Sequence, residues 1–193
     1  MDFTPQLVLA SSSPRRRDLL ARIGVEPRRI VSPDIDESPH KAEMPRVYAL
    51  RMAVEKAMAV ARRQGEIILS GDTTVAVGRR ILQQATDPDM QRRFLELLSG
   101  RRHHVLSAVC VIDAKGNVRS KISDTIVRFK RLSPQEIDAY IACGEGIGKA
   151  GGYAIQGRAE ALVDWMAGSH SGVVGLPLYE TRLLLKAAGF GGL

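Results

Sequence analysis

Three serines, a proline and three arginines follow directly on an apolar run near the start of the chain, as Ser-Ser-Ser-Pro-Arg-Arg-Arg at 11–17. The apolar run at 7–10 is typical of a strand, and residues 19–23 continue as the apolar face of a helix. Ser13 is a good N-cap for that helix, and Pro14 suits its first position. Unpaired N–H groups, the positive end of the helix dipole, hydroxyls and guanidiniums then converge on one loop, which suits an anionic ligand. A capped surface helix with a solvated basic turn is the alternative.

Asp72 is the best single candidate for chemistry, because it interrupts the apolar run at 67–77. Aspartate is disfavoured in strands, and a buried carboxylate is costly unless it meets a cation or several hydrogen-bond donors. Gly71 beside it allows close approach of backbone or ligand. The pattern predicts a long bent strand, or a strand pair, with a carboxylate at its centre.

Lys56 and an acidic turn, both N-terminal to Asp72 in the sequence, supply charges of opposite sign. Residues 43–63 predict a helix with an apolar stripe made of Leu50, Ala53, Val54, Ala57, Val60 and Ala61. At about 100° per residue, Lys56 falls beside this stripe, either as a cation at a cleft edge or as an ordinary surface lysine. The turn at 32–39 holds Asp34, Asp36 and Glu37, which form either a plain acidic turn or oxygen ligands for a divalent cation.

A second glycine-rich stretch occupies residues 148–157. Its glycines permit positive φ and close backbone approach. Lys149, Tyr153 and Gln156 add a cation, a ring and an amide that can read the edge of a base. A flexible loop is the alternative interpretation.

The remaining elements alternate between strands and helices, which indicates an α/β fold. Strands are expected at 7–10, 30–31, 67–77, 81–84, 104–113, 118–129 and 162–166, and helices at 14–23, 43–63, 87–100, 133–141 and 178–188. Between the last strand and helix we expect a turn at 168–170 and an irregular segment at 173–177. His103 and His104 are adjacent, so in a strand they point to opposite faces and cannot share a metal.

Composition narrows the function classes. With 193 residues and 45% hydrophobic content, the chain can bury one sizeable core, and we expect a single domain over 1–193. The sequence shows no membrane-spanning run and no export leader, so we expect a cytoplasmic protein without membrane partners. Cys110 and Cys143 are expected to be reduced core residues. The net charge of +7 permits polyanion binding, but the basic pairs are scattered and no nucleic-acid-binding module is visible.

Taken together and in this order, six motifs resemble the Maf family, the house-cleaning nucleoside triphosphate pyrophosphatases once described as septum-formation inhibitors. They are Leu-Ala-Ser-Ser-Ser-Pro-Arg-Arg at 9–16 with Asp-Glu at 36–37, Leu-Arg-Met-Ala-Val-Glu-Lys-Ala at 50–57, Gly-Asp-Thr at 71–73, Leu-Ser-Gly at 98–100, Lys-Ala-Gly-Gly-Tyr-Ala-Ile-Gln-Gly at 149–157 and Val-Gly-Leu-Pro at 174–177. The resemblance covers nearly the whole chain. The end of the glycine-rich stretch is similar to the branch that acts on dTTP and UTP.

The resemblance implies a fold like that of Maf and inosine triphosphate pyrophosphatases, with an elongated mixed sheet, flanking helices and a deep cleft between two lobes. It implies hydrolysis of the bond between the α- and β-phosphates, with Mg²⁺ or Mn²⁺ as cofactor, to give a monophosphate and pyrophosphate. By the same resemblance, Asp72 activates water, Lys56 neutralises developing charge, and Glu37 together with Asp72 holds the metal. Phosphate binding would come from Ser11, Ser13, Arg16, Gln84 and Lys149, and substrate choice from Arg15, Thr73 and Gln156.

Two departures from the family pattern stand out. The family usually has a second active-site lysine followed by proline where this chain has Gln84-Ala85, and an acidic residue where it has Gly148. A catalytically weakened nucleotide-binding regulator of cell division therefore remains an alternative, as does a nucleic-acid-binding protein on grounds of charge. The oligomeric state, including a homodimer, is left open.

Overall fold

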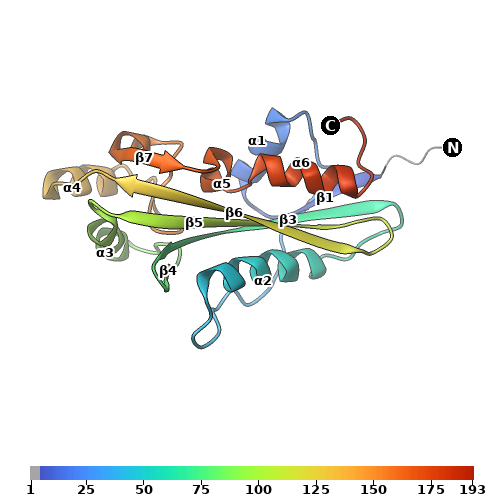
Figure 1. The fold of residues 1–193 in the computed structure, drawn as a ribbon, viewed down its shortest axis with the longest axis horizontal. Helices are drawn as coiled ribbons and strands as arrows, with labels where there is room; N and C mark the ends of the chain where they lie inside the picture. Colours follow the sequence, from blue (N-terminus) through green and yellow to red (C-terminus); the bar gives the residue numbers. More distant parts are fainter. Residues whose placement is uncertain (1–4) are drawn as a thin grey trace.

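The computed structural model describes residues 5–193. The expectation that the chain has no export leader concerns the N-terminus, and its first four residues lie outside the described part. An elongated sheet of seven strands forms its long axis (Figure 1). The strands are β1 Gln6–Ala10, β2 Arg29–Val31, β3 Glu66–Val77, β4 Arg80–Leu82, β5 Arg102–Ile112, β6 Val118–Phe129 and β7 Val163–Ala167. The helices are α1 Pro14–Arg22, α2 Pro45–Met58, α3 Pro88–Leu98, α4 Pro134–Ala142, α5 His170–Val174 and α6 Leu178–Ala187, with a 3₁₀ turn, η1, at Arg158–Leu162. The expected mixed sheet with flanking helices is confirmed.

The sheet has a gap along one side of β3, and this gap locates the site. The strand order is β2-β1-β3-β5-β6-β7, and β4 also pairs with β3. Strand β1 runs parallel to residues 66–70 of β3, and β4 runs antiparallel to residues 75–77. On its other side β3 pairs with β5 continuously over 68–76. Residues 71–74 therefore have a free edge beside the carboxyl end of β1, which is where open α/β sheets bind ligands.

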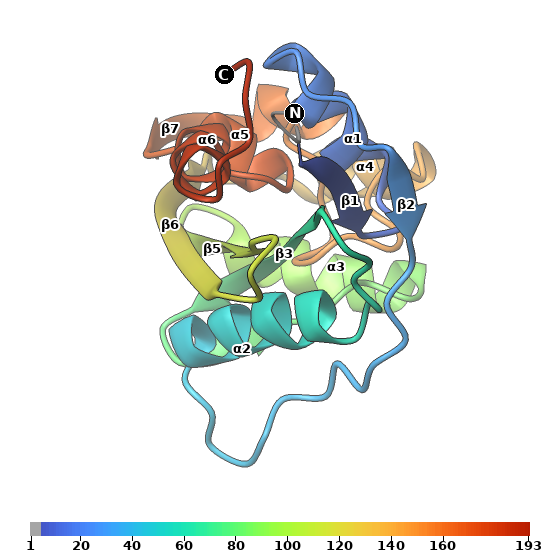
Figure 2. The ribbon, with the colours of Figure 1, turned by 90° about the vertical axis from the view of Figure 1, so that its right-hand side faces the viewer.

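Alternation along the strands sends neighbouring residues to opposite layers. Side chains such as Val8, Ile68 and Ala108 pack with the alanines of α2 in one core cluster. The opposite face packs in a second cluster that includes residues of α1 and α6, and Figure 2 shows α2 on one side of the sheet with α1 and α6 on the other. Because successive strand side chains alternate, Asp72 faces α2 whereas Thr73 faces the layer of α1 and α5.

Local sequence signals explain most helix ends. The Asp87 side chain accepts a hydrogen bond from the Met90 N–H at the start of α3, and Ser133 with Glu136 forms a capping box at α4. Helix α1 begins at Pro14 as predicted and ends before Gly24, whose φ is +70°. Ser13 occupies the N-cap position, but its side chain makes no capping hydrogen bond. Ser13 is thus the N-cap residue, as predicted, but it lacks the side-chain hydrogen bond expected of an N-cap serine.

Three other predictions need correction. Helix α2 is shorter than the expected 43–63 and its buried face is turned by about one residue, because Ala49, Met52, Ala53, Lys56 and Ala57 are buried while Leu50 and Val54 are only partly covered. Residues 170–174, for which no helix was expected, form the short helix α5, which begins at the last residue of the turn expected at 168–170. Cys110 is buried, whereas Cys143 is only half-buried; both are free thiols.

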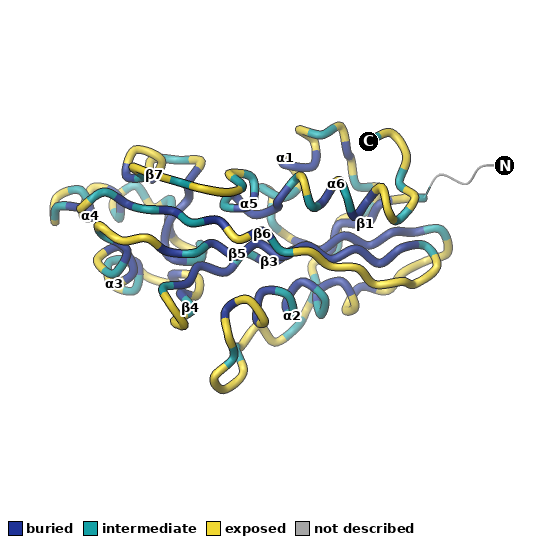
Figure 3. Tube along the Cα trace, viewed as in Figure 1, coloured by how far each residue is buried: buried dark blue, intermediate teal, exposed yellow. Residues whose placement is uncertain are grey.

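Burial is concentrated in the central strands. Figure 3 shows β3 and β5 buried over most of their length, while the long loop before α2 is largely exposed. His103 is fully buried, whereas the His104 side chain is about half-exposed, as strand alternation predicts. Burial lowers the pKa of His103 to about 4, so this ring is neutral at pH 7. Within residues 5–193, no helix combines the length and apolarity needed to cross a membrane.

Candidate active site

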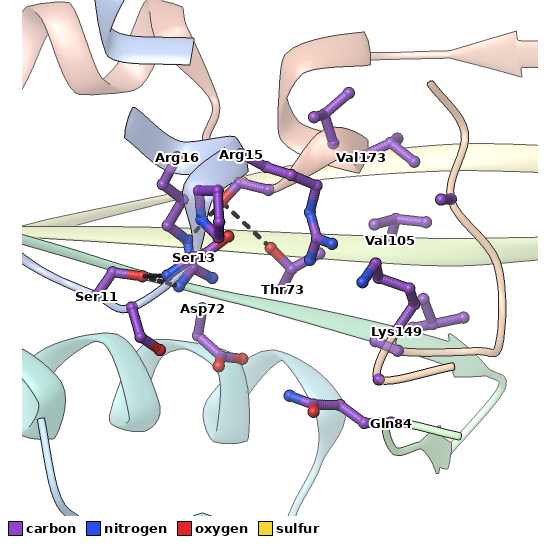
Figure 4. Close-up of a pocket in the computed structure, with 18 of the residues that line it drawn as sticks. Ser11, Ser13, Arg15, Arg16, Asp72, Thr73, Gln84, Val105, Lys149 and Val173 are labelled. Atoms are coloured by element: carbon purple, nitrogen blue, oxygen red, sulfur yellow. Dashed lines mark hydrogen bonds between the residues drawn. The ribbon is translucent and has the colours of Figure 1, made fainter. Parts of the chain in front are cut away.

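A cavity of about 380 Å³ opens at the gap beside β3. Segments far apart in the sequence line it: the Ser11–Arg16 loop, the middle of β3, the glycine-rich stretch and the end of α5. All eleven candidate site residues line this cavity: Ser11, Ser13, Arg15, Arg16, Glu37, Lys56, Asp72, Thr73, Gln84, Lys149 and Gln156. Figure 4 shows how most of them converge on the cavity from different elements. The fold thus brings these eleven residues together, whereas Asp36 of the acidic turn lines only an adjoining hollow and Asp34 lines neither.

The serine-arginine loop forms one end of the cavity. Arg16 donates from Nη1 to the Ser11 hydroxyl at 2.9 Å and from Nε to the Gly175 carbonyl at 2.9 Å. The Ser13 backbone N–H also donates to the Ser11 hydroxyl, at 3.2 Å. Burial lowers the pKa of Arg16, while nearby Asp72 raises it. A guanidinium held in this way at the start of α1, beside the uncommitted Ser13 hydroxyl, is a preorganised anion site.

Asp72, Lys56 and Glu37 form a charged group on the α2 side of the gap. The Lys56 ammonium donates to Asp72 Oδ1 at 2.9 Å and to Glu37 Oε2 at 2.7 Å. Asp72 and Lys56 are buried, with exposed fractions of 5% and 6%, whereas the Glu37 side chain is about half-exposed at 46%. Lys56 therefore lies on the buried face of α2 and is neither a surface lysine nor peripheral to the cavity.

Neighbouring side chains hold the Asp72 carboxylate and the backbone of Glu37 in place. The Thr74 hydroxyl donates to Asp72 Oδ2 at 2.9 Å, and the Tyr48 hydroxyl donates to the Glu37 carbonyl at 2.8 Å. Burial and the charges of Asp72 and Glu37 raise the pKa of Tyr48, so it remains a donor. Each oxygen of Asp72 thus has one fixed partner and keeps lone-pair capacity for another.

Arg15, from α1, and Lys149, from the glycine-rich stretch, both line the cavity, and their side chains extend towards each other in Figure 4. Burial lowers the pKa of Arg15, and burial together with the charge of Arg15 lowers the pKa of Lys149. Within residues 5–193, neither cation forms an ion pair with a carboxylate. Two uncompensated cations across a cavity favour a ligand with several negative charges.

The remaining candidates surround the wider part of the cavity. Thr73 donates to the Gly175 carbonyl at 3.4 Å, and exposed Gln84 and Gln156 present their amides at the rim. Tyr153 also lines the cavity, but it is 5% exposed and its hydroxyl shares a hydrogen bond of 2.8 Å with His103 Nε2. Its ring packs edge-on against Phe129 and His103. Tyr153 therefore anchors the glycine-rich stretch and is not free to stack on a base.

A divalent cation fits this donor set only in company with a ligand. Glu37 and Asp72 offer two carboxylates, and no group of three or more metal-ligating side chains occurs within residues 5–193. Mg²⁺ is commonly bound through one or two carboxylates together with substrate phosphates and water. A second hollow of about 400 Å³, lined by Glu37, Asp72 and Tyr48 among others, adjoins the cavity on this side. Asp36 lines that hollow, and its pKa is lowered by hydrogen bonds from Ser38.

Sequence reasoning missed three supporting groups. Thr74 lies two residues beyond Asp72 on the same strand face, so alternation gave a usable signal. Tyr48 lies two helical turns before Lys56, which also indicates a shared face. The Gly175 carbonyl, in contrast, accepts a hydrogen bond from Arg16, which is 159 residues away in the sequence, and no local sequence pattern predicts this contact.

Comparisons with known proteins identify the family of this chain. Residues 6–188 match the family model described as Maf, Maf-like protein. A dTTP/UTP pyrophosphatase of Sphingopyxis alaskensis is 64% identical over 96% of this chain and 97% of its own length, and one of Novosphingobium aromaticivorans is 61% identical over 96% and 92%. The Ham1 protein of Staphylococcus aureus has a similar fold, with a TM-score of 0.50, 10% identity and coverage of 94% and 96% of the two chains. A family match over almost the entire sequence, supported by such close relatives, shows that the chain belongs to the Maf family.

Proposed function

We propose that this protein is a nucleoside triphosphate pyrophosphatase that cleaves the α–β phosphoanhydride of dTTP and UTP, giving the monophosphate and pyrophosphate. The observation that carries the proposal is the Asp72–Lys56–Glu37 group facing the Ser11–Arg16 loop across one cavity. Phosphoanhydride hydrolysis needs little covalent help from a protein. It needs cations around the phosphates, one oriented water and a carboxylate that can take its proton.

In this mechanism the triphosphate spans the cavity. Ser11, Ser13 and the N-terminus of α1 bind phosphate oxygens, while Arg16 places its guanidinium beside them. Arg15 and Lys149 compensate the outer negative charges. Because Arg16 is already held by Ser11 and Gly175, little reorganisation accompanies binding.

Asp72 takes the proton of the attacking water. Lys56 fixes Oδ1 and Thr74 fixes Oδ2, so the carboxylate is oriented before the substrate enters. The Lys56 ammonium also stabilises negative charge that develops on the phosphate oxygens. Glu37 and Asp72 are the residues that would hold Mg²⁺ or Mn²⁺, which when bound neutralises phosphate charge.

The direct test is a screen of standard and modified nucleoside triphosphates with Mg²⁺ or Mn²⁺, scored for both pyrophosphate and monophosphate. Release of pyrophosphate together with the monophosphate, fastest for dTTP or UTP, supports the proposal. Release of inorganic phosphate and a diphosphate would place cleavage at the β–γ bond and contradict it.

Gln156→Ala should flatten the preference among nucleotides more than it slows the best substrate. A site amide that pairs with the correct base is left unpaired by a wrong one, and this difference creates selectivity. The measurement is the ratio of kcat/KM for UTP and CTP. Glu160→Ala, an exposed change outside the cavity, serves as the control. An unchanged ratio in Gln156→Ala would reject this role for the amide.

Gln84→Lys should raise turnover severalfold, most clearly at low metal concentration. Gln84 lines the cavity, whereas Arg79 and Arg80 are exposed and line neither hollow, which supports a missing charge at Gln84 over compensation by either arginine. A charged donor should improve on a neutral one by about 1 kcal/mol. Gln83→Lys adds the same charge beside the second hollow only. An equal gain in both variants would indicate a general effect of net charge instead.

The alternative of an inactive regulator is not favoured, because Asp72, Lys56 and Glu37 form a complete charged group in the cavity. Gln84 is the only support for an inactive regulator, and the Gln84→Lys measurement bears on that alternative directly.

Nucleoside triphosphates are cytoplasmic metabolites, so the proposed reaction places the protein in the cytoplasm.

A further inference from the structure

We propose that Gln91 is a positioning residue that sets nucleotide selectivity by holding the glycine-rich stretch in place. Gln91 is a buried residue of α3 and does not line the cavity. The proposal rests on the proposed function. Figure 1 shows α3 beside β4, on the side of the molecule away from α1. Gln91 touches none of the residues proposed for catalysis. Its effect would pass through the segment that carries Lys149 and Gln156.

The geometry begins with one long-range hydrogen bond. Gln91 is 0% exposed, and its Nε2 donates to the Gly152 carbonyl at 3.1 Å. Its Oε1 is buried and has no hydrogen-bond partner among residues 5–193. An unpaired buried amide oxygen is unfavourable, and a leucine would fill the same space without it. The contribution of the amide to this site is therefore its bond to the glycine-rich stretch.

The stretch is shaped around this side chain. A Cβ on Gly146 would lie 2.2 Å from Gln91 Nε2, and a Cβ on Gly152 would lie 3.1 Å from Gln91 Cγ. Gly152 also has a φ of +72°, which favours glycine. The segment therefore wraps closely on Gln91 at two points, and Lys149 lies between them.

Backbone hydrogen bonds link the segment held by Gln91 to residues that line the cavity. The Ala85 N–H donates to the Lys149 carbonyl at 3.1 Å, and the Gly148 N–H donates to the Ala85 carbonyl at 2.8 Å. On the other side of Gly152, the Ala154 N–H donates to the Tyr140 hydroxyl at 3.0 Å. The Gly151 N–H is also held, by the Leu82 and Gln83 carbonyls at 3.3 and 3.1 Å, so the Gln91 bond is what fixes the next carbonyl, that of Gly152. Loss of this bond would loosen the chain beyond Gly152 and shift Gln156 relative to a bound nucleotide, whereas Asp72 and Lys56, on β3 and α2, would not move.

The test is Gln91→Leu, which keeps a buried side chain of similar size but removes the amide donor. We expect the UTP/CTP ratio of kcat/KM to fall by about fivefold, the equivalent of one hydrogen bond, through KM, with kcat for the better substrate nearly unchanged. Affinities for the α,β-methylene analogues of UTP and CTP should show the same loss of discrimination. Because these analogues need no turnover, an inactive wild-type protein would refute the proposed function and still leave Gln91 testable.

Phe94→Leu is the matched control, since Phe94 lies on the same helix and in the core, and its truncation lowers stability without removing a bond to the stretch. It should lower the unfolding midpoint and leave both ratios at wild-type values. Unchanged ratios in Gln91→Leu would overturn the proposal. So would an equal shift in Phe94→Leu, or a wild-type protein that binds the two analogues equally.

Discussion

Asp72→Asn lowers turnover by about 10²-fold or more, because the substitution removes the general base while keeping its shape. Nucleotide affinity measured without divalent metal should stay the same or increase, since the neutral amide no longer repels the triphosphate. The measurement is kcat for dTTP or UTP, together with the dissociation constant of a non-hydrolysable analogue. A fall in kcat without weaker binding separates loss of the base from loss of the site.

Asp124→Asn provides the control for this prediction. Asp124 pairs with His104 on an exposed part of the sheet, outside the cavity. The same chemical change there should leave kcat within about twofold, as expected for a surface substitution. Near-normal turnover in a folded Asp72→Asn protein would remove Asp72 from the mechanism.

Lys56→Met abolishes most turnover and also lowers the free energy of unfolding by about 3 kcal/mol at pH 7, as expected when one partner of a buried ion pair is removed. The thioether side chain matches the length of the lysine stem but cannot neutralise Asp72, whose carboxylate is buried at 8% side-chain exposure. Activity and stability should therefore fall together.

The double variant Lys56→Met/Asp72→Asn distinguishes this explanation from simple loss of packing. Removing both charges should recover much of the lost unfolding free energy, while turnover stays at the level of the worse single variant. Chemical denaturation of the four proteins at pH 7 gives the coupling energy. Strictly additive losses of unfolding free energy would show that Lys56 and Asp72 do not act as a pair.

Much of the fold follows from local patterns. The apolar runs and turn residues predicted most strands, and the capping box at Ser133 and Glu136 placed α4. The same signals failed where local and tertiary preferences differ. The apolar pattern of 43–63 suggested a longer helix and placed Lys56 beside the buried stripe, but packing of small residues against the sheet turns the buried face of α2 so that it includes Lys56. The five-residue helix α5 is too short to give a clear periodic signal.

The sequence by itself determined which residues carry charge, hydrogen-bonding groups and conformational freedom, and the Ser11–Arg16 loop, Asp72 and Lys149 were recognisable from that alone. Only the tertiary structure decided how they meet. The gap between β1 and β4 exposes the edge of β3 at Asp72, strand register turns Asp72 towards Lys56, and a chain separation of 159 residues brings Gly175 to Arg16. A hydrogen bond requires its donor and acceptor atoms to lie about 3 Å apart. No local sequence pattern specifies that distance between segments far apart in the chain. It is set by the topology of the sheet and by side-chain packing between those segments.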